Sequence, residues 1–474
     1  MRDPLNRDRR RLLRRLAVLP FAGTGVSMMS GGEAIAAECG AGAADARSLV
    51  CIFLAGGADS FNMFVPGGGA YDDYRETRRE LAAGENELLE VSDPSQGRFG
   101  FNALLPEFAR LYGEERLAVV SNTGTLIRPT TRSDYLGETS LPQSLFAHNT
   151  QQKLWQTGAG IVNGSNALGW GGAIGEHAEN CNGRIALPSS FSIGGSSDWL
   201  ASARSNYVSL NADVAVERMF GYDNISDWIP RGSRLANIGV SLEELIRQGR
   251  AESNPLMQRG ISDAVGRASD ATASLHTALQ ENSLDSIGFD RLNKLASQLH
   301  LVARLIASRE RLGMQRQVFY VLMGGFDTHS NQLERQPVLM RELNSAIGLF
   351  QNAVDDLGLS DSVTAFTASD FGRTLTSNGN GTDHGWGGHA FVFGGAVDGG
   401  RVVGETPSYA VRNNPDDAGE DDGSFAGRII PKISVTQYAA TLSRWMGMDE
   451  ADITRAMPDL ANFTDTDLGL FRGA

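Results

Sequence analysis

The chain has 474 residues, of which 41% are hydrophobic, so it can bury a core as one large α/β domain or two smaller ones. Its formal net charge of −14 disfavours nucleic acids and anionic membranes as partners. Its three cysteines, Cys39, Cys51 and Cys181, indicate neither a disulfide framework nor a zinc–thiolate or iron–sulfur cluster.

Residues 1–36 have the features of a twin-arginine signal peptide. Paired arginines lie within the basic segment 9–14, an apolar stretch follows over 16–29, and small residues at 34–36 offer a cleavage site. The apolar stretch is too short to remain as a membrane-spanning helix. We therefore expect export by the twin-arginine translocase to the periplasm or beyond, with no integral membrane anchor. Because the segment holds seven Arg and three acidic residues, the mature chain would carry a net charge of −18.

The remaining chain, 45–472, is expected to form a single α/β domain. A strand, a helix and a second strand follow one another over 318–367, an order that implies a right-handed crossover in a parallel sheet. Residues 183–265 are poorly patterned and rich in Ser, Asn and Gly, which favours an insertion or a lid. Apolar runs predict strands at 48–54, 117–120, 318–323 and 363–367, and helical spacing predicts helices at 151–156, 290–306, 338–357 and 435–446.

Three of these strands end alike, because a Gly- or Ser-bearing turn follows each of them and then an acidic residue. Ligands of open α/β sheets bind at the carboxyl ends of strands, and carboxylates and imidazoles gathered there can form a metal site. A glycine-rich loop after strand 363–367 adds further acidic and imidazole groups. We expect one or two divalent ions, which could be zinc, manganese, magnesium or calcium. The candidate ligands are Asp59, Asp327, His329, Asp370, Asp383, His384 and His389.

The spacing of these residues suggests which of them bind the metal and which orient its ligands. In an extended segment, Asp327 and His329 point to the same side and could meet one metal. Asp383 and His384 are adjacent, so one of them is expected to bind the metal while the other orients it. An acid after a strand, such as Asp370, can instead cap the next helix, and this alternative stays open.

Three further residues are candidates for catalysis or substrate binding. His148 stands just before the predicted helix 151–156, where it would position or protonate a substrate. Arg373 and Arg132 are candidate anion clamps, since a guanidinium matches phosphate or sulfate oxygens bidentately. The alternative for each arginine is an ordinary ion pair. The glycine-rich loops form neither a Walker loop nor a dinucleotide fingerprint, which disfavours nucleotide binding by those routes.

At these residues the chain resembles a known family. Segments 325–329, 369–374 and 383–389 resemble the signature segments of the "domain of unknown function 1501" family, and the likeness continues at 56–62 and 437–442. Members are typically exported by the twin-arginine route, and the family is grouped by fold with the alkaline phosphatases and sulfatases. The resemblance implies a three-layer α/β/α sandwich with a mostly parallel sheet and metal ligands at its strand ends.

The resemblance also implies a nucleophile, and here the chain departs from the pattern. The superfamily uses a Ser, Thr or modified Cys at a helix start, and relatives often carry Ser before the His of segment 146–149, where this chain has Ala147. Thr150, Ser144 and Ser60 are the available substitutes. Alternatively, a metal-bound hydroxide could attack the substrate directly.

The leading hypothesis is an exported metal-dependent hydrolase that acts on a small anionic phosphate or sulfate ester. The alternative is a non-catalytic exported protein that kept a phosphatase-like scaffold and binds a ligand or assists a surface or periplasmic assembly. Ala147 favours the alternative, as does the interval of 13 residues between Asp370 and Asp383.

Overall fold

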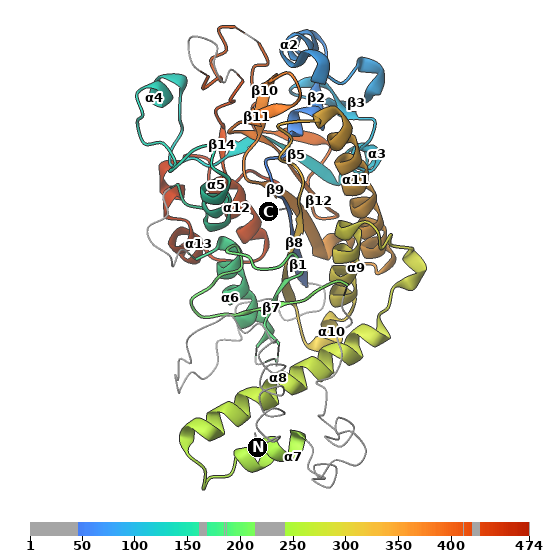
Figure 1. Ribbon diagram of the computed structural model, residues 1–474, viewed down its shortest axis with the longest axis vertical. Coiled ribbons are helices and arrows are strands. Elements are labelled where there is room, and N and C mark those ends of the chain that lie inside the picture. Colours follow the sequence, from blue (N-terminus) through green and yellow to red (C-terminus); the bar gives the residue numbers. More distant parts are fainter. Residues whose placement is uncertain are drawn as a thin grey trace, which may run out of the picture.

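The computed structural model describes residues 46–160, 168–183, 185, 187–213, 242–410, 412–419 and 427–473. The expected signal peptide lies outside these residues. Within them, nine strands form one central sheet (Figure 1). Their order is β13 (Arg401–Val403), β5 (Leu117–Gly124), β12 (Gly388–Gly394), β9 (Val363–Ser369), β1 (Arg47–Leu54), β8 (Arg316–Met323), β6 (Ser190–Ser192) and β7 (Tyr207–Ser209), with β14 (Ile433–Ser434) beside β5.

The strands of this sheet are parallel except for β12, which runs antiparallel to both of its neighbours. The register is even at the centre, where Leu54 at the end of β1 lies opposite both Met323 of β8 and Ser369 of β9. The turns that follow these three strands therefore begin at one level. The predicted α/β fold with a mostly parallel sheet is confirmed.

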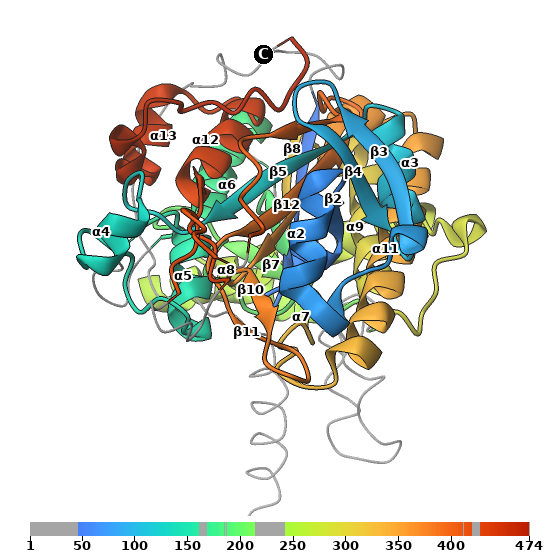
Figure 2. The same cartoon turned by 90° about the horizontal axis from the view of Figure 1, so that it is seen from above.

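Helices cover both faces of the sheet and make it the middle of three layers (Figure 2). Strand β1 shows why, since Val50, Ile52 and Leu54 pack into one core and the alternate residues Leu49 and Phe53 pack into the other. One face carries α3 (Pro106–Gly113), α9 (Lys294–Ala307) and α11 (Gln332–Asp356), and the other carries α5 (His148–Thr157), α6 (Trp170–Asn182), α12 (Val435–Trp445) and α13 (Glu450–Ala456).

Two smaller sheets stand beyond the central one. The hairpin of β10 (Arg373–Ser377) and β11 (Thr382–His384) pairs Arg373 with His384 and turns through Gly379, whose φ of 96° suits glycine. This hairpin brings residues from the glycine-rich loop to the ends of β1, β8 and β9. The other small sheet has the order β2 (Phe64–Pro66), β4 (Gly97–Asn102), β3 (Leu88–Asp93).

The predicted helices form, with shifted ends. Helix α9 starts at Lys294 because the Asn293 side chain accepts a hydrogen bond from the Ala296 N–H, and Leu292 is left 92% exposed. Helix α11 begins six residues earlier than expected and continues through Pro337. The remaining helices are α2 (Gly69–Arg78), α4 (Arg132–Leu136), α7 (Leu242–Gly249), α8 (Leu256–Glu281) and α10 (Arg309–Leu312).

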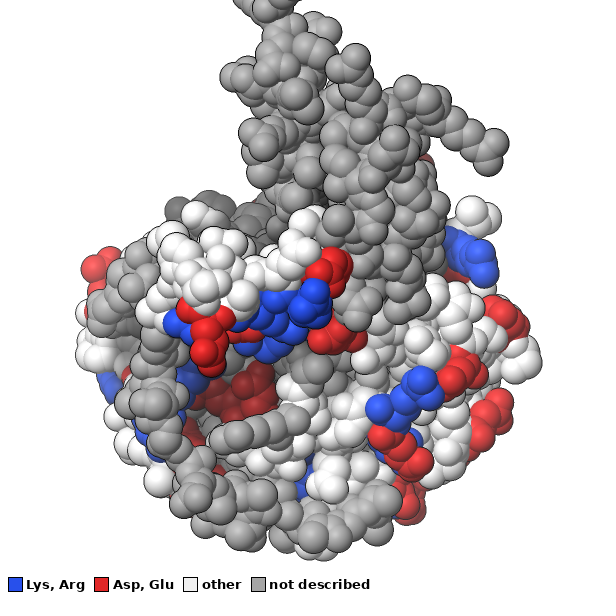
Figure 3. Space-filling model, turned by 90° about the horizontal axis from the view of Figure 1, so that it is seen from below, with Lys and Arg blue, Asp and Glu red and all other residues white. Residues whose placement is uncertain are grey.

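Residues 183–265 were expected to form an insertion or a lid. In the structure, one part of this segment belongs to the central sheet and another part lies at one end of the molecule. Strands β6 and β7 extend the central sheet from β8. Helix α7 and the start of α8 lie at the end of the molecule opposite the β10–β11 hairpin (Figure 1). Residues 214–241 of the segment lie outside the described part. On the face seen from below, basic and acidic side chains lie next to one another (Figure 3). Among the described helices, none has both the length and the apolar character that a membrane span requires.

Candidate metal centre

Asp327 is the carboxylate around which the candidate centre is built. It follows β8 after a turn in which Gly325 adopts a φ of 104°. Arg373 Nη1 donates to Asp327 Oδ1 over 3.0 Å. The buried Arg373 side chain is itself held by the β10–β11 hairpin, because its Nη2 donates to the Thr382 carbonyl over 2.8 Å. Burial alone would raise the pKa of Asp327, but Arg373 and His329 outweigh it and lower that pKa, so the carboxylate is ionised and oriented.

His148 is the first residue of α5 and faces Asp327 from the opposite side. Its Nδ1 lies 2.6 Å from Asp370 Oδ2, an oxygen that also accepts from Gln152 Nε2 over 2.8 Å. The Gly56 N–H donates to the other oxygen of Asp370 over 3.2 Å. The hydrogen bond to Asp370 raises the pKa of His148. Because the carboxylate accepts the Nδ1 proton, Nε2 of the neutral ring carries a lone pair.

His384 and His329 are oriented in the same way. His384 Nδ1 lies 2.6 Å from the Phe146 carbonyl oxygen, and His329 Nδ1 lies 3.0 Å from Asp383 Oδ1. A carbonyl and an ionised carboxylate can only accept, so each Nδ1 carries the hydrogen and each Nε2 is free to act as a ligand. Burial lowers the pKa of His384, which favours this neutral ring.

Three imidazole Nε2 atoms gather around the Asp327 carboxylate, and one ligand atom from each of His148, Asp327 and His384 lies within 4.8 Å of the other two. Asp327 Oδ1 lies 3.2 Å from His329 Nε2 and 3.4 Å from His384 Nε2, and Asp327 Oδ2 lies 3.6 Å from His148 Nε2. The two nitrogens of His329 and His384 are 2.8 Å apart. Bonds of about 2.0–2.1 Å to a tetrahedral ion would place ligand atoms about 3.3 Å from one another. The spacings of 2.8–3.6 Å lie on both sides of that value, with His148 next to Oδ2 of Asp327 and the other two histidines next to Oδ1.

Two further observations fit a cation at this point. Nε2 of His148 is buried and has no hydrogen-bond partner among the described residues. The lone pairs of His329 and His384 would repel one another across 2.8 Å unless a proton or a cation lay between them. Three imidazole nitrogens and one carboxylate oxygen form a donor set that suits zinc, whereas magnesium and calcium prefer oxygen ligands.

Phe371 shields one side of the centre and Asp327 opens the other. The Phe371 ring packs against the rings of His148 and His384, with centroids 4.8 Å and 4.6 Å away. By contrast, the side chains of Asp327 and His329 are 47% and 43% exposed. A substrate would therefore approach from the side of these two residues.

The structure brings together the candidates that follow β8 and those of the β10–β11 hairpin. Asp327, His329 and His384 supply three of the converging atoms, and His148, which we expected to act on the substrate, supplies the fourth. Asp370 and Asp383 lie behind His148 and His329 and orient them, so Asp370 does not cap a helix.

Other candidates lie elsewhere and have other partners. The Asp59 carboxylate forms a buried ion pair with Arg78 and accepts a hydrogen bond from Gln332. His389 is buried on β12, where its ring packs edge-on against Phe61, and burial lowers its pKa to about 3.

Three polar candidates also lie outside the group of converging atoms. Arg132 donates to the carbonyls of Asp417 and Gly419 and so anchors a loop. Arg373 Nη1 donates to the Asp327 carboxylate, so this nitrogen is not available to bind a substrate anion. Thr150 stands two residues after His148 on α5, a spacing that turns its side chain away from the histidine.

Sequence reasoning missed two residues that shape the centre, Gln152 and Phe371. Gln152 carried a signal, because a residue four positions after His148 on a helix shares its face and can bind the same partner. Phe371 sits between Asp370 and Arg373 in the sequence, but its contacts with two histidines depend on the hairpin and on α5.

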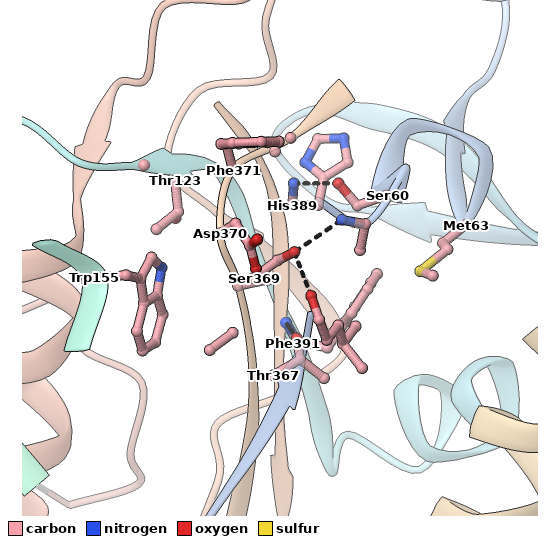
Figure 4. A pocket seen from close by; sticks show the side chains of 17 residues that line it. Ser60, Met63, Thr123, Trp155, Thr367, Ser369, Asp370, Phe371, His389 and Phe391 are labelled. Carbon is pink, nitrogen blue, oxygen red and sulfur yellow. Dashed lines mark hydrogen bonds between the residues drawn. The ribbon is translucent and has the colours of Figure 1, made fainter. Parts of the chain in front are cut away.

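A small cavity with a mostly apolar lining lies behind Asp370 (Figure 4). Its volume is about 30 Å³, and Asp370, Ser369 and His389 help to line it. Ser60 accepts the His389 N–H over 2.7 Å, which turns this hydroxyl toward the back of the site. The cavity is too small for an ester substrate and has room for about one water.

One family model matches part of the chain, and several solved structures are distantly similar to it. The family described as "Protein of unknown function (DUF1501)" matches residues 242–422, which confirms the resemblance over that range. No curated protein matches the sequence.

Among solved structures, the lipoteichoic acid synthase LtaP from Listeria monocytogenes is 7% identical, with 88% of this chain and 76% of that chain covered and a TM-score of 0.35. The structure of Ps i-CgsB is 9% identical over 89% of this chain and 77% of that chain, with a TM-score of 0.35. The PsFucS1 sulfatase from Pseudoalteromonas sp. is 9% identical over 90% and 73%, with a TM-score of 0.32. The chemistry of the centre therefore rests on this chain's own residues.

Proposed function

We propose that this protein is an exported, metal-dependent hydrolase of phosphate or sulfate esters. The observation that carries the proposal is the convergence of three oriented imidazole Nε2 atoms on the carboxylate of Asp327. Zinc held by His148, His329, His384 and Asp327 would lower the pKa of bound water to about 7 and polarise an ester oxygen. The ester class is the one that the sequence resemblance implies.

The surrounding residues have definable tasks in such a reaction. Asp370, Asp383 and the Phe146 carbonyl hold the Nδ1 protons and so keep the Nε2 lone pairs available. Arg373 keeps Asp327 ionised and in place. Helix α5 begins at the centre with His148, and the positive end of its dipole favours an anionic substrate there.

The positions of the hydroxyl candidates support attack by water rather than by a side chain. Ser60 lines the cavity behind Asp370, Ser144 is exposed before α5, and Thr150 is turned from His148. Ala147 is the N-cap residue of α5, with φ −102° and ψ 116°. A Ser at that position would be well placed to cap the helix, which is a structural role independent of nucleophilic attack.

Export is part of the proposal and has one structural observation beside the sequence signal. Cys181 is disulfide-bonded, which is a single bond rather than a disulfide framework, whereas Cys51 is free and buried. Disulfides persist in oxidising compartments such as the periplasm. The twin-arginine route fits a protein that acquires its metal while folding in the cytoplasm.

The test is metal-dependent turnover by the mature protein, residues 37–474. Aryl phosphates and aryl sulfates would be assayed with zinc and, separately, with manganese, magnesium and calcium. We expect zinc-dependent turnover that His384→Ala abolishes and that His300→Ala, a histidine bound to the Ser283 carbonyl, leaves intact. Stoichiometric zinc without turnover of any ester would support the non-catalytic alternative, which the absence of Ser at position 147 favours.

A further inference from the structure

A polar pocket lies beside the candidate metal centre on helix α5. Amide, hydroxyl and charged side chains line it, whereas histidines dominate the metal centre. We call this polar pocket the α5 pocket. Its volume is about 170 Å³, against roughly 30 Å³ for a water molecule in the liquid. It therefore has room for a small organic group. Its lining residues are Asn149, Gln152, Lys153, Gln156, Ser196 and Asp198.

Gln152 joins the pocket to the centre. Its Nε2 donates to the same Asp370 oxygen that holds His148, and its side chain also forms part of the pocket wall. Four residues of helix rise about 6 Å, so Gln152 stands about one turn along α5 from His148. The pocket and the metal centre are therefore neighbours that share the Gln152 side chain.

The side chains of the pocket match a neutral ligand with many hydroxyl groups. Three of them are amides and one is a hydroxyl, and both types of group can donate and accept hydrogen bonds, as a hydroxyl ligand requires. Lys153 and Asp198 add one positive and one negative charge, which cancel and so select neither an anion nor a cation. A lining this polar offers little to an aryl or alkyl group.

Lys153 and Asp198 are free to meet a ligand. Among the described residues, neither the Lys153 ammonium nor the Asp198 carboxylate takes part in an ion pair. Gln156 is buried and its oxygen accepts the Trp199 N–H over 2.8 Å, which fixes the side chain at the base of the pocket. Part of the pocket is therefore rigid while its charged rim remains available.

We infer that the α5 pocket binds a sugar or another polyol, and that this group is the alcohol portion of the ester cleaved at the metal centre. The claim that the bound polyol is the alcohol portion of the ester rests on the proposed function, since only a hydrolase releases an alcohol product. The claim that the pocket binds a polyol rests only on the residues that line the pocket. The substrate class is then a glycosyl or polyol phosphate or sulfate.

The test measures binding without turnover. Saturation-transfer NMR would be recorded on the mature protein with a mixture of free hexoses and glycerol, and with phenol as the non-polyol probe. We expect transfer to at least one hexose or to glycerol and none to phenol. Lys153→Met and Asp198→Asn should each remove more than nine-tenths of that signal, whereas Lys294→Met, an exposed lysine at the start of α9, should leave it unchanged.

The outcomes separate this inference from the proposed function. No transfer to any polyol, or an equal signal in Lys153→Met and Asp198→Asn, overturns the pocket assignment even if aryl esters are hydrolysed. Polyol binding in a protein that hydrolyses no ester supports the pocket and overturns the link to hydrolysis. Zinc content, measured in all variants, shows that the metal centre is unchanged when polyol binding is lost.

Discussion

His329 and His384 direct their Nε2 atoms at each other across 2.8 Å, while the Nδ1 atom of each ring is already bound to an oxygen. When each Nδ1 carries the ring hydrogen, the two Nε2 lone pairs face each other beside the ionised carboxylate of Asp327, and a shared proton or a bound cation must lie between them. A bound cation removes the repulsion. The stability of the protein should therefore depend on metal.

Adding zinc to metal-free mature protein should raise its melting temperature. A ligand at 100 times its dissociation constant stabilises the folded state by about 2.7 kcal/mol, and at 1,000 times by about 4.1 kcal/mol. The double variant His329→Ala/His384→Ala should lose this shift because half of the ligand set is gone. Calorimetry with and without zinc makes the measurement, and an equal shift in the double variant would place the metal elsewhere.

Asp370→Asn should weaken zinc binding without unfolding the protein. The amide keeps the shape of the side chain but holds the Nδ1 proton of His148 less strongly, and losing such a partner typically costs about 10–100-fold in metal affinity. Competition with a chromogenic chelator would measure the change. Asp361→Asn, an exposed residue before β9, is the matched control. Unchanged affinity in Asp370→Asn would show that Asp370 does not orient the ligand.

Arg373→Lys should destabilise the fold by about 1–3 kcal/mol, because an ammonium cannot satisfy the Thr382 carbonyl and the Asp327 carboxylate together. Arg335→Lys is the control, since Arg335 is exposed although it also binds carbonyls of the same turn. Urea unfolding would compare the two variants. Equal losses would indicate that the buried fork of Arg373 has no special role.

Stability should fall as pH drops below about 6.5, in part because of His389. Burial lowers the pKa of this residue from 6.5 to about 3, so the unfolded chain takes up a proton that the folded chain refuses between these values. Each pH unit in that window costs up to about 1.4 kcal/mol from this one group. His389→Gln should flatten the dependence of the unfolding free energy on pH between 6.5 and 4. An unchanged slope would contradict the assignment of His389 as a neutral core residue.

Ala147→Ser should stabilise the protein by about 0.5–1 kcal/mol, because Ser is a better N-cap than Ala for α5. Ala159→Ser, beyond the other end of the helix, serves as the control. Ester turnover should stay within twofold of the parent. A large gain in turnover together with a covalent phosphoryl-enzyme would instead identify position 147 as a nucleophile site.

The sequence predicted the fold and part of the centre for one physical reason. Parallel strands end at one edge of a sheet, and the level register of β1, β8 and β9 places Asp327 and Asp370 there. The hairpin that returns Asp383 and His384 to this edge was signalled by its glycines, although its register was not.

Other residues depended on contacts that one sequence does not display. Asp59 follows a strand as Asp327 does, yet Arg78 on α2 neutralises it, and nothing in the spacing of the two residues marks that pair. His389 follows a glycine loop as His384 does, but it lies within β12, whose pairing with β5 and β9 sends the ring into the core beside Phe61. The pattern of an acidic residue or a histidine after a strand or a glycine loop therefore predicts that the residue lies near a strand end. It does not predict whether the side chain points toward the metal centre or into the core.

X-ray absorption at the zinc edge tests the central claim most directly. The mature protein, loaded with one equivalent of zinc, should show three imidazole nitrogens and one carboxylate oxygen at about 2.0–2.2 Å, with the imidazole scattering reduced in His148→Ala. Coordination by oxygen alone, or a spectrum that His148→Ala, His329→Ala and His384→Ala all leave unchanged, would contradict the account.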